Sequence, residues 1–134
     1  MSGRPRVFNR FVVKRLDSDS GRREGLFQAA VRLRESDDIT GQDRKLLVAL
    51  FNWFNQKLKR PARLSLSARP HAKAQAISWF KGTSTQHISR MRQFQRILER
   101  YGIAVEMLLT RRPGYIVYED EFQVAAYPFS DTRT

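Results

Sequence analysis

The stretch Gln75–Leu109, with the sequence QAISWFKGTSTQHISRMRQFQRILERYGIAVEMLL, determines the predicted fold. Its two ends, Gln75–Phe80 and Ile103–Leu109, are short apolar runs that favour strands. Between them, the pair Thr83–Ser84 offers N-cap residues for a long helix, and Gly102 is of the type that commonly follows a helix C-terminus. The stretch therefore predicts a strand–helix–strand unit, in which a right-handed crossover makes the two strands parallel.

The predicted helix of this unit has two kinds of surface. Apolar residues recur at spacings of three and four and define a core stripe, formed by Ile88, Met91, Phe94, Leu98 and Tyr101. Arg92, Arg96 and Arg100 follow one another at i, i+4 spacing elsewhere on the helix, with Arg90 nearby. We therefore expect the helix to pack on a sheet with one face and to present arginines to solvent with another.

The C-terminal part of the chain has the pattern of antiparallel hairpins. Arg111–Gly114 has proline at a position that turns favour, and Tyr115–Tyr118 is a β-prone run of aromatic and branched residues. Glu119–Glu121 is a charged turn before a last strand, Phe122–Tyr127. The two tyrosines of the first run are three residues apart, so a regular strand would place their rings on opposite faces.

The N-terminal half is predicted to supply one strand and two helices. Val7–Leu16 is rich in valine and phenylalanine and is expected to be a strand that joins an edge of the sheet, whereas Asp17–Gly25 has the composition of a loop. Leu26–Glu35 has helical spacing, although its alternation leaves a strand as the alternative. Asp43–Leu58 is the surest helix, with Thr40 as its cap, and its wide apolar surface predicts a central, buried position.

These elements together predict an α+β fold with a mixed sheet of four or five strands and about three helices. Arg63–Ser67 alternates and is a candidate for a further short edge strand. The length of 134 residues suits a single domain. We expect Met1–Arg6 to be a flexible basic arm and Ser130–Thr134 to be a loose tail.

The positive charge of the chain is concentrated in its centre. The sequence has 25 Lys and Arg against 13 Asp and Glu, a formal net charge of +12. The 55 residues of Arg44–Leu98 contain twelve of these cations and no acid, and the rest of the chain has as many acids as bases. Segregation of this kind indicates a polyanionic partner, because clustered cations neutralise phosphates and release their counterions.

The sequence therefore predicts a small nucleic-acid-binding protein that contacts phosphates and reads little base sequence, with DNA and RNA left open. The predicted contact residues are Lys57, Lys59, Arg60, Arg63, Lys81, Arg90, Arg92, Arg96 and Arg100. The first three also suit the C-terminal end of a helix, where cations complement the helix dipole. The alternative is a protein-interaction module that docks onto an acidic partner, because the charge signature would be the same.

The sequence favours a binding protein over an enzyme. It contains no Cys, which excludes disulfides, thiolate catalysis and Cys-based zinc sites, and no Gly-rich phosphate loop is present. His87, in the first turn of the predicted helix, is a weak candidate for a general base. With His87 as its general base, a metal-independent ribonuclease is a further alternative. No metal ligand set or cofactor is predicted.

Two features bear on the location of the protein. No apolar run approaches the roughly 20 residues of a membrane-spanning helix. The basic N-terminus lacks the apolar segment of a secretory signal, because Arg10, Lys14 and Arg15 interrupt its apolar patch. We expect a cytoplasmic protein without a membrane span.

Overall fold

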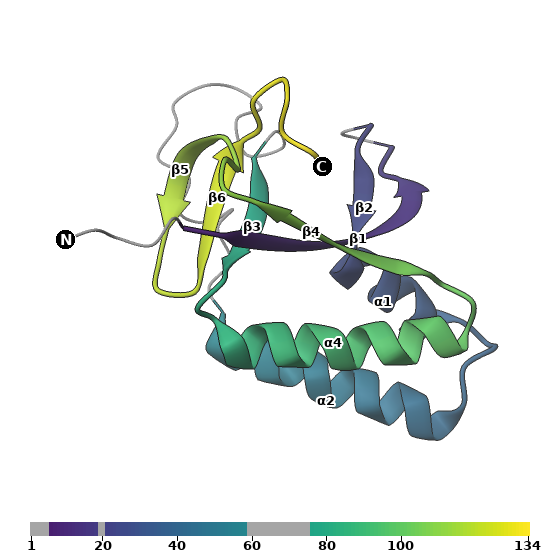
Figure 1. The fold of residues 1–134 in the computed structure, drawn as a ribbon. Coiled ribbons are helices and arrows are strands. Elements are labelled where there is room, and N and C mark those ends of the chain that lie inside the picture. Colours follow the sequence, from purple (N-terminus) through teal and green to yellow (C-terminus); the bar gives the residue numbers. More distant parts are fainter. Residues whose placement is uncertain (1–5, 19–20, 59–75) are drawn as a thin grey trace.

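The long strand β1 (Phe8–Leu16) is the centre of the fold, because it pairs with three other strands. The computed structural model describes residues 6–18, 21–58 and 76–134 (Figure 1). Within these residues the chain forms three helices and six strands, an α+β fold. The other elements are β2 (Arg23–Gly25), α1 (Leu26–Glu35), α2 (Gly41–Lys57), β3 (Ile77–Lys81), α4 (Thr85–Arg100), β4 (Val105–Thr110), β5 (Tyr115–Glu119) and β6 (Gln123–Tyr127).

The two edges of β1 have different neighbours. β4 pairs with one edge along residues 8–13 of β1. The other edge is divided, because Phe8 and Asn9 pair with β3 whereas Val12 and Leu16 pair with β2. β3 continues to β6 and then β5, which gives the order β2-β1-β3-β6-β5 with β4 beside β1. Every pairing is antiparallel.

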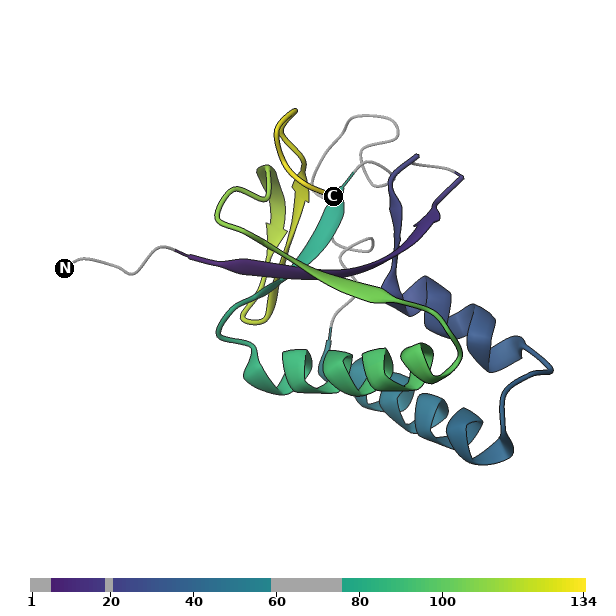
Figure 2. The ribbon, with the colours of Figure 1, turned by 45° about the vertical axis from the view of Figure 1, so that its right-hand side comes forward.

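The strand–helix–strand unit is confirmed as β3, α4 and β4, and the C-terminal hairpin as β5 and β6. β1 lies between β3 and β4 and is antiparallel to both, so these two strands run in the same direction without pairing (Figures 1 and 2). The sheet therefore has six strands rather than four or five, is antiparallel rather than mixed, and has the N-terminal strand inside it. The local pattern of such a unit does not reveal whether a third strand inserts.

Two other differences concern the N-terminal half. The region predicted as a loop, Asp17–Gly25, contains the short strand β2, which pairs with β1 across a register shift. Three residues are too few for an alternation pattern, which explains why the sequence did not predict β2. The candidate strand Arg63–Ser67 lies outside the described residues.

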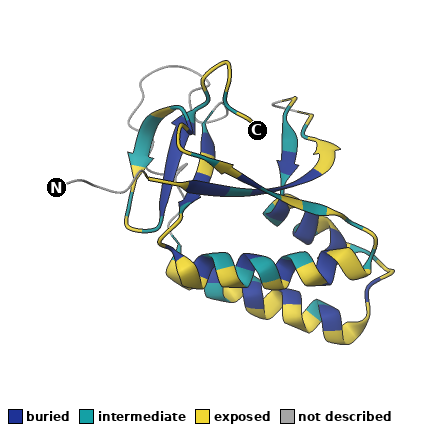
Figure 3. Cartoon of the chain, viewed as in Figure 1, coloured by how far each residue is buried: buried dark blue, intermediate teal, exposed yellow. Residues whose placement is uncertain are grey.

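The helix predicted over Leu26–Glu35 is confirmed as α1 with the same bounds. α2 begins after Thr40, whose Oγ1 accepts a hydrogen bond from the backbone N–H of Asp43 at 3.1 Å, as predicted. Its predicted central position was wrong. α2 packs against α1 and α4, and Leu46 and Val48 are 43% and 40% exposed (Figure 3). The apolar residues of α2 cover a wide part of its circumference, but the helix is less buried than this width predicts.

The sheet separates two apolar clusters, both built by residue alternation along its strands. One lies between the sheet and the helices, with Phe94 of α4 fully buried in it. The other lies on the opposite face and contains Val12, Trp79 and Leu108. All three helices thus lie on one side of the β1–β4 ribbon (Figures 1 and 2), and its opposite face carries the second cluster, in which Val12 and Leu108 are buried.

A register shift in β5 changes the orientation of its tyrosines. Tyr115 pairs with Tyr127 and Tyr118 with Ala125, which are two apart on β6. Paired residues point to the same face, so Tyr115 and Tyr118 share a face, in contrast to the expectation from regular alternation. Tyr115 is 69% exposed, whereas the hydroxyl of Tyr118 donates a hydrogen bond to Asp120 at 2.6 Å.

Candidate nucleic-acid interface

One face of α4 is exposed along its whole length. The opposite face is buried and carries His87, Met91, Phe94, Ile97 and Leu98. The exposed residues are polar or basic except for Glu99, and Figure 3 shows them along the outer side of the helix. They are Thr85, Gln86, Ser89, Gln93, Arg96, Glu99 and Arg100. The amphipathic pattern predicted from the sequence is therefore present, and the predicted arginines lie on or beside the solvent face.

Arg90 and Arg92 flank this exposed strip, and each rests on a neutral partner. The guanidinium of Arg90 lies 4.1 Å from the ring centroid of Trp53 on α2. Arg92 donates hydrogen bonds to Gln95 Oε1 at 2.8 Å and to Met107 Sδ at 3.4 Å. Aromatic, amide and thioether groups orient a cation without cancelling its charge. Neither arginine therefore has a carboxylate partner among the described residues, and both are half-buried beside the exposed strip.

Arg96 and Arg100 differ in their neutralisation. Arg96 is exposed and has no partner among the described residues. Arg100 donates to Asp43 Oδ1 at 2.7 Å, and Tyr101 donates to Asp43 Oδ2 at 2.6 Å. The hydrogen bond from Tyr101, followed by the charge of Arg100, lowers the pKa of Asp43, so this carboxylate stays ionised. Arg100 is therefore largely neutralised.

The other predicted residues are distributed around this helix. Lys57 is exposed at the end of α2, where its carbonyl oxygen is 3.1 Å from His87 Nε2 in the first turn of α4. Lys81 is paired with Glu119 at 2.6 Å, and this contact lowers the pKa of Glu119. Lys59, Arg60 and Arg63 lie outside the described residues. We name Arg90, Arg92, Arg96, Arg100 and Lys57 the helix face.

His87 is a core residue in this structure. It is 3% exposed, its ring centroid lies 4.3 Å from that of Phe122 and 4.9 Å from that of Trp53, and Nε2 is held by the carbonyl of Lys57. A substrate has no access to the ring in this arrangement. The contacts of His87 with Lys57 and Trp53 connect α4 to α2. They give no support to its predicted role as a general base.

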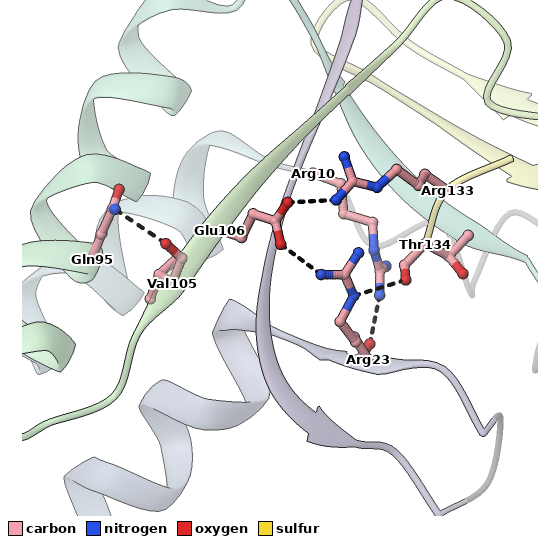
Figure 4. Close-up of polar contacts among 7 residues, drawn as sticks. All are labelled: Arg10, Arg23, Gln95, Val105, Glu106, Arg133 and Thr134. Carbon is pink, nitrogen blue, oxygen red and sulfur yellow. Dashed lines mark hydrogen bonds and ion pairs between the residues drawn. The ribbon is translucent and has the colours of Figure 1, made fainter.

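A second concentration of cations lies on the other side of the β1–β4 ribbon, and the sequence did not predict it. We name Arg10, Arg22, Arg23 and Arg133 the arginine cluster. Arg23 Nη1 and Arg133 Nη2 donate to the two oxygens of Glu106 on β4, at 2.6 and 2.9 Å. Figure 4 shows Glu106 between these guanidiniums, with Gln95 of α4 on the opposite side of β4.

The C-terminal residues also bind this cluster. Arg23 Nε donates to the carbonyl oxygen of Thr134 at 3.2 Å (Figure 4), and Arg22 Nη1 donates to the hydroxyl of Thr134 at 3.3 Å. Thr132 donates to the carbonyl of Arg112 at 3.1 Å. Residues of the predicted loose tail therefore have hydrogen bonds to Arg23 of β2 and to the turn between β4 and β5.

Arg10 is a half-buried member of the cluster. Its Nη2 donates to the carbonyl of Arg23 at 2.8 Å, and it has no carboxylate partner among the described residues. Burial, with the nearby charges of Arg22 and Arg23, lowers the pKa of Arg10 to about 10. The guanidinium is still protonated at neutral pH. Arg10 therefore carries its positive charge in a partly desolvated position beside two other cations.

Two N–H donors in this region lack an acceptor. Arg10 Nε and Trp79 Nε1 are buried without a hydrogen-bond partner among the described residues. Asn9 pairs with Phe80, so the next residues along, Arg10 and Trp79, are neighbours on one face of the sheet. Each such unsatisfied donor costs about 1–3 kcal/mol. Both residues line a cavity of about 720 Å³ together with Arg22 and Arg23.

Comparison with protein-family models, with curated proteins and with solved structures finds no match to this chain. Among the described residues, no group of His, Asp and Glu side chains is arranged to hold a metal ion. None of the helices in the described part of the chain is long and apolar enough to cross a bilayer. The site therefore rests on geometry and charge alone.

The arginine cluster was missed because its members are far apart in the sequence, from Arg10 to Arg133. Only Arg10 gave a local signal, since it interrupts the apolar alternation of Phe8 and Val12 in a strand. That signal indicates a cation on an apolar face, but it identifies none of the other members.

Proposed function

We propose that the protein binds nucleic acid through the helix face, mainly by contacts with phosphates. The observation that carries the proposal is that Arg96 lies on the exposed strip of α4, that Arg90 and Arg92 flank this strip, and that the described partners of these two are neutral. Such guanidiniums donate bidentate hydrogen bonds to phosphate oxygens without first breaking an ion pair. Ser89, Gln93 and similar residues between them are suited to further phosphate contacts.

The charge balance of this surface supports a polyanion. The helix face supplies five cations, and the nearby carboxylates are Asp43 and Glu99, which leaves a net charge of +3. Four of the five cations lie on α4 between Arg90 and Arg100, and Lys57 lies at the end of α2. Ten residue steps along a helix are about 15 Å, which is long enough to contact more than one phosphate of a strand. Little base selectivity is expected, because phosphate contacts carry no sequence information.

The test is binding of labelled mixed-sequence DNA and RNA at several salt concentrations. We expect affinity for both, with log Kd rising against log salt by a slope of at least about 2, as for the neutralisation of a few phosphates. The absorbance ratio at 260 and 280 nm of protein purified at low salt should also fall after a high-salt wash. Absence of binding at low ionic strength would contradict the proposal.

The alternative partner is an acidic protein, which would recognise the same cations. It predicts that an acidic polypeptide such as polyglutamate displaces oligonucleotides at equal charge concentration, whereas the proposed function predicts that it does not. We also propose a cytoplasmic location, where nucleic acid is available to such a surface. A ribonuclease function has no support from the buried His87.

A further inference from the structure

We propose that the arginine cluster is a separate binding site for a phosphate-type oxyanion, on the face of the β1–β4 ribbon opposite α4. The inference does not depend on the proposed function. It starts from the two N–H groups that the described residues leave without an acceptor, Arg10 Nε and Trp79 Nε1. Both are donors only, so their common partner has to be an acceptor, and an anion satisfies this requirement.

The geometry brings these donors together. β1 and β3 are paired at Asn9 and Phe80, so Arg10 and Trp79 are cross-strand neighbours with side chains on the same face. They and Arg23 line one cavity of about 720 Å³, which also extends to Phe54 of α2 and Met91 of α4. That volume lies in the range of small-molecule sites. Donors from β1, β2 and β3 therefore border one space.

The charge balance indicates the class of anion. The four arginines of the cluster carry four positive charges, and two carboxylates lie beside them: Glu106, which Arg23 and Arg133 contact, and Asp17, which lines the same cavity. Two positive charges remain, and a phosphate dianion matches them better than a carboxylate does. Arg23 and Arg133 already bind carboxylate or carbonyl oxygens in the structure, which demonstrates that their guanidiniums face the same region (Figure 4).

The phosphate group has two possible sources, a free phosphate or phosphomonoester and the terminal phosphate of a nucleic-acid strand. Both present the same oxyanion to Arg10 and Trp79. An extended strand passing over the site is a weaker fit, because its internal phosphates carry one negative charge each. The experiment therefore compares inorganic phosphate with oligonucleotides that have or lack a 5′-phosphate.

The test is an NMR titration of the whole chain with inorganic phosphate, at an ionic strength kept constant with sodium chloride. The indole N–H of Trp79 and the Nε–H of Arg10 are both visible in nitrogen–proton correlation spectra, so the two donors report directly. We expect both signals to shift saturably. The indole of Trp53, which packs against Arg90, reports phosphate at the helix face instead and so distinguishes binding there from binding at the arginine cluster.

Two variants make the result specific. Arg10→Gln should weaken phosphate binding at least tenfold, whereas Arg15→Gln, an exposed arginine on the same strand, should leave it unchanged. If Arg10→Gln fails to fold, Trp79→Phe keeps a buried ring, removes one donor and should weaken binding severalfold. Acetate should bind more weakly than phosphate. A 5′-phosphate on an oligonucleotide should shift the same two signals if strand ends are the source, and free phosphate alone should shift them otherwise.

Three results would overturn the inference. They are shifts that do not saturate, shifts that chloride reproduces at equal ionic strength, and phosphate binding that Arg10→Gln and Trp79→Phe both leave intact. The double variant Arg92→Glu/Arg96→Glu separates this inference from the proposed function. It should lose oligonucleotide affinity and keep the phosphate shifts, so either inference can fail without the other.

Discussion

The helix face and the arginine cluster are both rich in arginine, but they differ in what surrounds the guanidiniums. On the helix face, Arg90 lies over Trp53 and Arg92 against an amide and a thioether, so both charges are half-buried and have no carboxylate partner among the described residues. In the arginine cluster, Arg23 and Arg133 share Glu106, and Arg10 is half-buried. The helix face is therefore suited to an extended polyanion, whereas the arginine cluster is suited to a small anion that a few directed donors can bind.

The partners of an arginine thus matter more than the number of arginines. An exposed ion pair contributes little net energy, and its cation has to leave one anion before it binds another. A cation on an aromatic ring keeps its charge and is already oriented. We therefore expect variants of the helix face to change binding of nucleic acid, and variants of the arginine cluster to change stability and small-anion binding.

The largest effect is expected from reversing two charges on the helix face. Arg92→Glu with Arg96→Glu should raise the Kd for mixed-sequence oligonucleotides more than about tenfold and lower the salt slope by about 2, for DNA and RNA alike. Lys45→Glu with Arg111→Glu makes the same change in net charge at exposed positions away from this face. Equal losses in both variants would mean that total charge, rather than the helix face, determines affinity.

A second effect concerns acid stability and the arginine cluster. The hydrogen bond from Arg23, and then the charge of Arg133, lower the pKa of Glu106 from its ordinary value of 4.5. A carboxylate with a lowered folded-state pKa stabilises the fold above its unfolded pKa and loses that contribution as the pH falls. Glu106→Gln should therefore lower the melting temperature near pH 7 and reduce its further decrease between about pH 5 and pH 3.

Thermal unfolding followed by circular dichroism measures this effect. Glu121→Gln, which changes an exposed carboxylate in the β5–β6 turn, is the matched control and should alter the profile less. Identical pH profiles for the Glu106→Gln variant and the unaltered chain would show that the ion pairs of the cluster do not contribute to folding.

A smaller effect compares two arginines of the same helix. Arg96 has no partner among the described residues, whereas Arg100 is paired with Asp43. Arg96→Ala should weaken oligonucleotide binding about two- to fivefold, the range expected for one exposed charge contact. Arg100→Ala should weaken it less. If Arg100→Ala had the larger effect in a fluorescence-anisotropy titration, the partner-based ranking of these arginines would be wrong.

The smallest effect is expected from Arg133→Ala. Its guanidinium pairs with Glu106 on the far side of β4, so its loss should change oligonucleotide affinity less than about twofold. The same anisotropy titration is sufficient to measure it. If Arg133→Ala lost as much oligonucleotide affinity as the Arg92→Glu/Arg96→Glu variant, the helix face and the arginine cluster would belong to one interface.

The sequence predicted most of what depends on neighbours along the chain. α1 and α4, the cap of α2 by Thr40 and the arginines on the exposed side of α4 all follow from local spacing. The insertion of β1 between β3 and β4 could not be predicted in this way, because strand order depends on tertiary packing. The prediction of a central position for α2 was wrong for a related reason. The number of apolar residues around a helix does not determine which of its sides are covered by other elements.

The arginine cluster illustrates the same limit at a site. Arg10, Arg23, Glu106 and Arg133 meet only because β1 bridges β2 and β4 and the tail returns to the sheet. The bulge that turns Tyr115 and Tyr118 to one face is likewise invisible in a regular alternation. Charge counting identified the central basic block, but it could not distinguish neutralised from uncompensated arginines.

The most direct test of the central claim is to map an oligonucleotide onto the chain by NMR. We predict that a strand lacking a 5′-phosphate shifts backbone amide signals of α4, chiefly at Ser89, Arg92 and Arg96, and that the shifts diminish as salt is added. Signals of β1, β2 and the C-terminal tail should remain in place. Shifts confined to Arg10, Arg23 and Thr134, with α4 unaffected, would contradict the account.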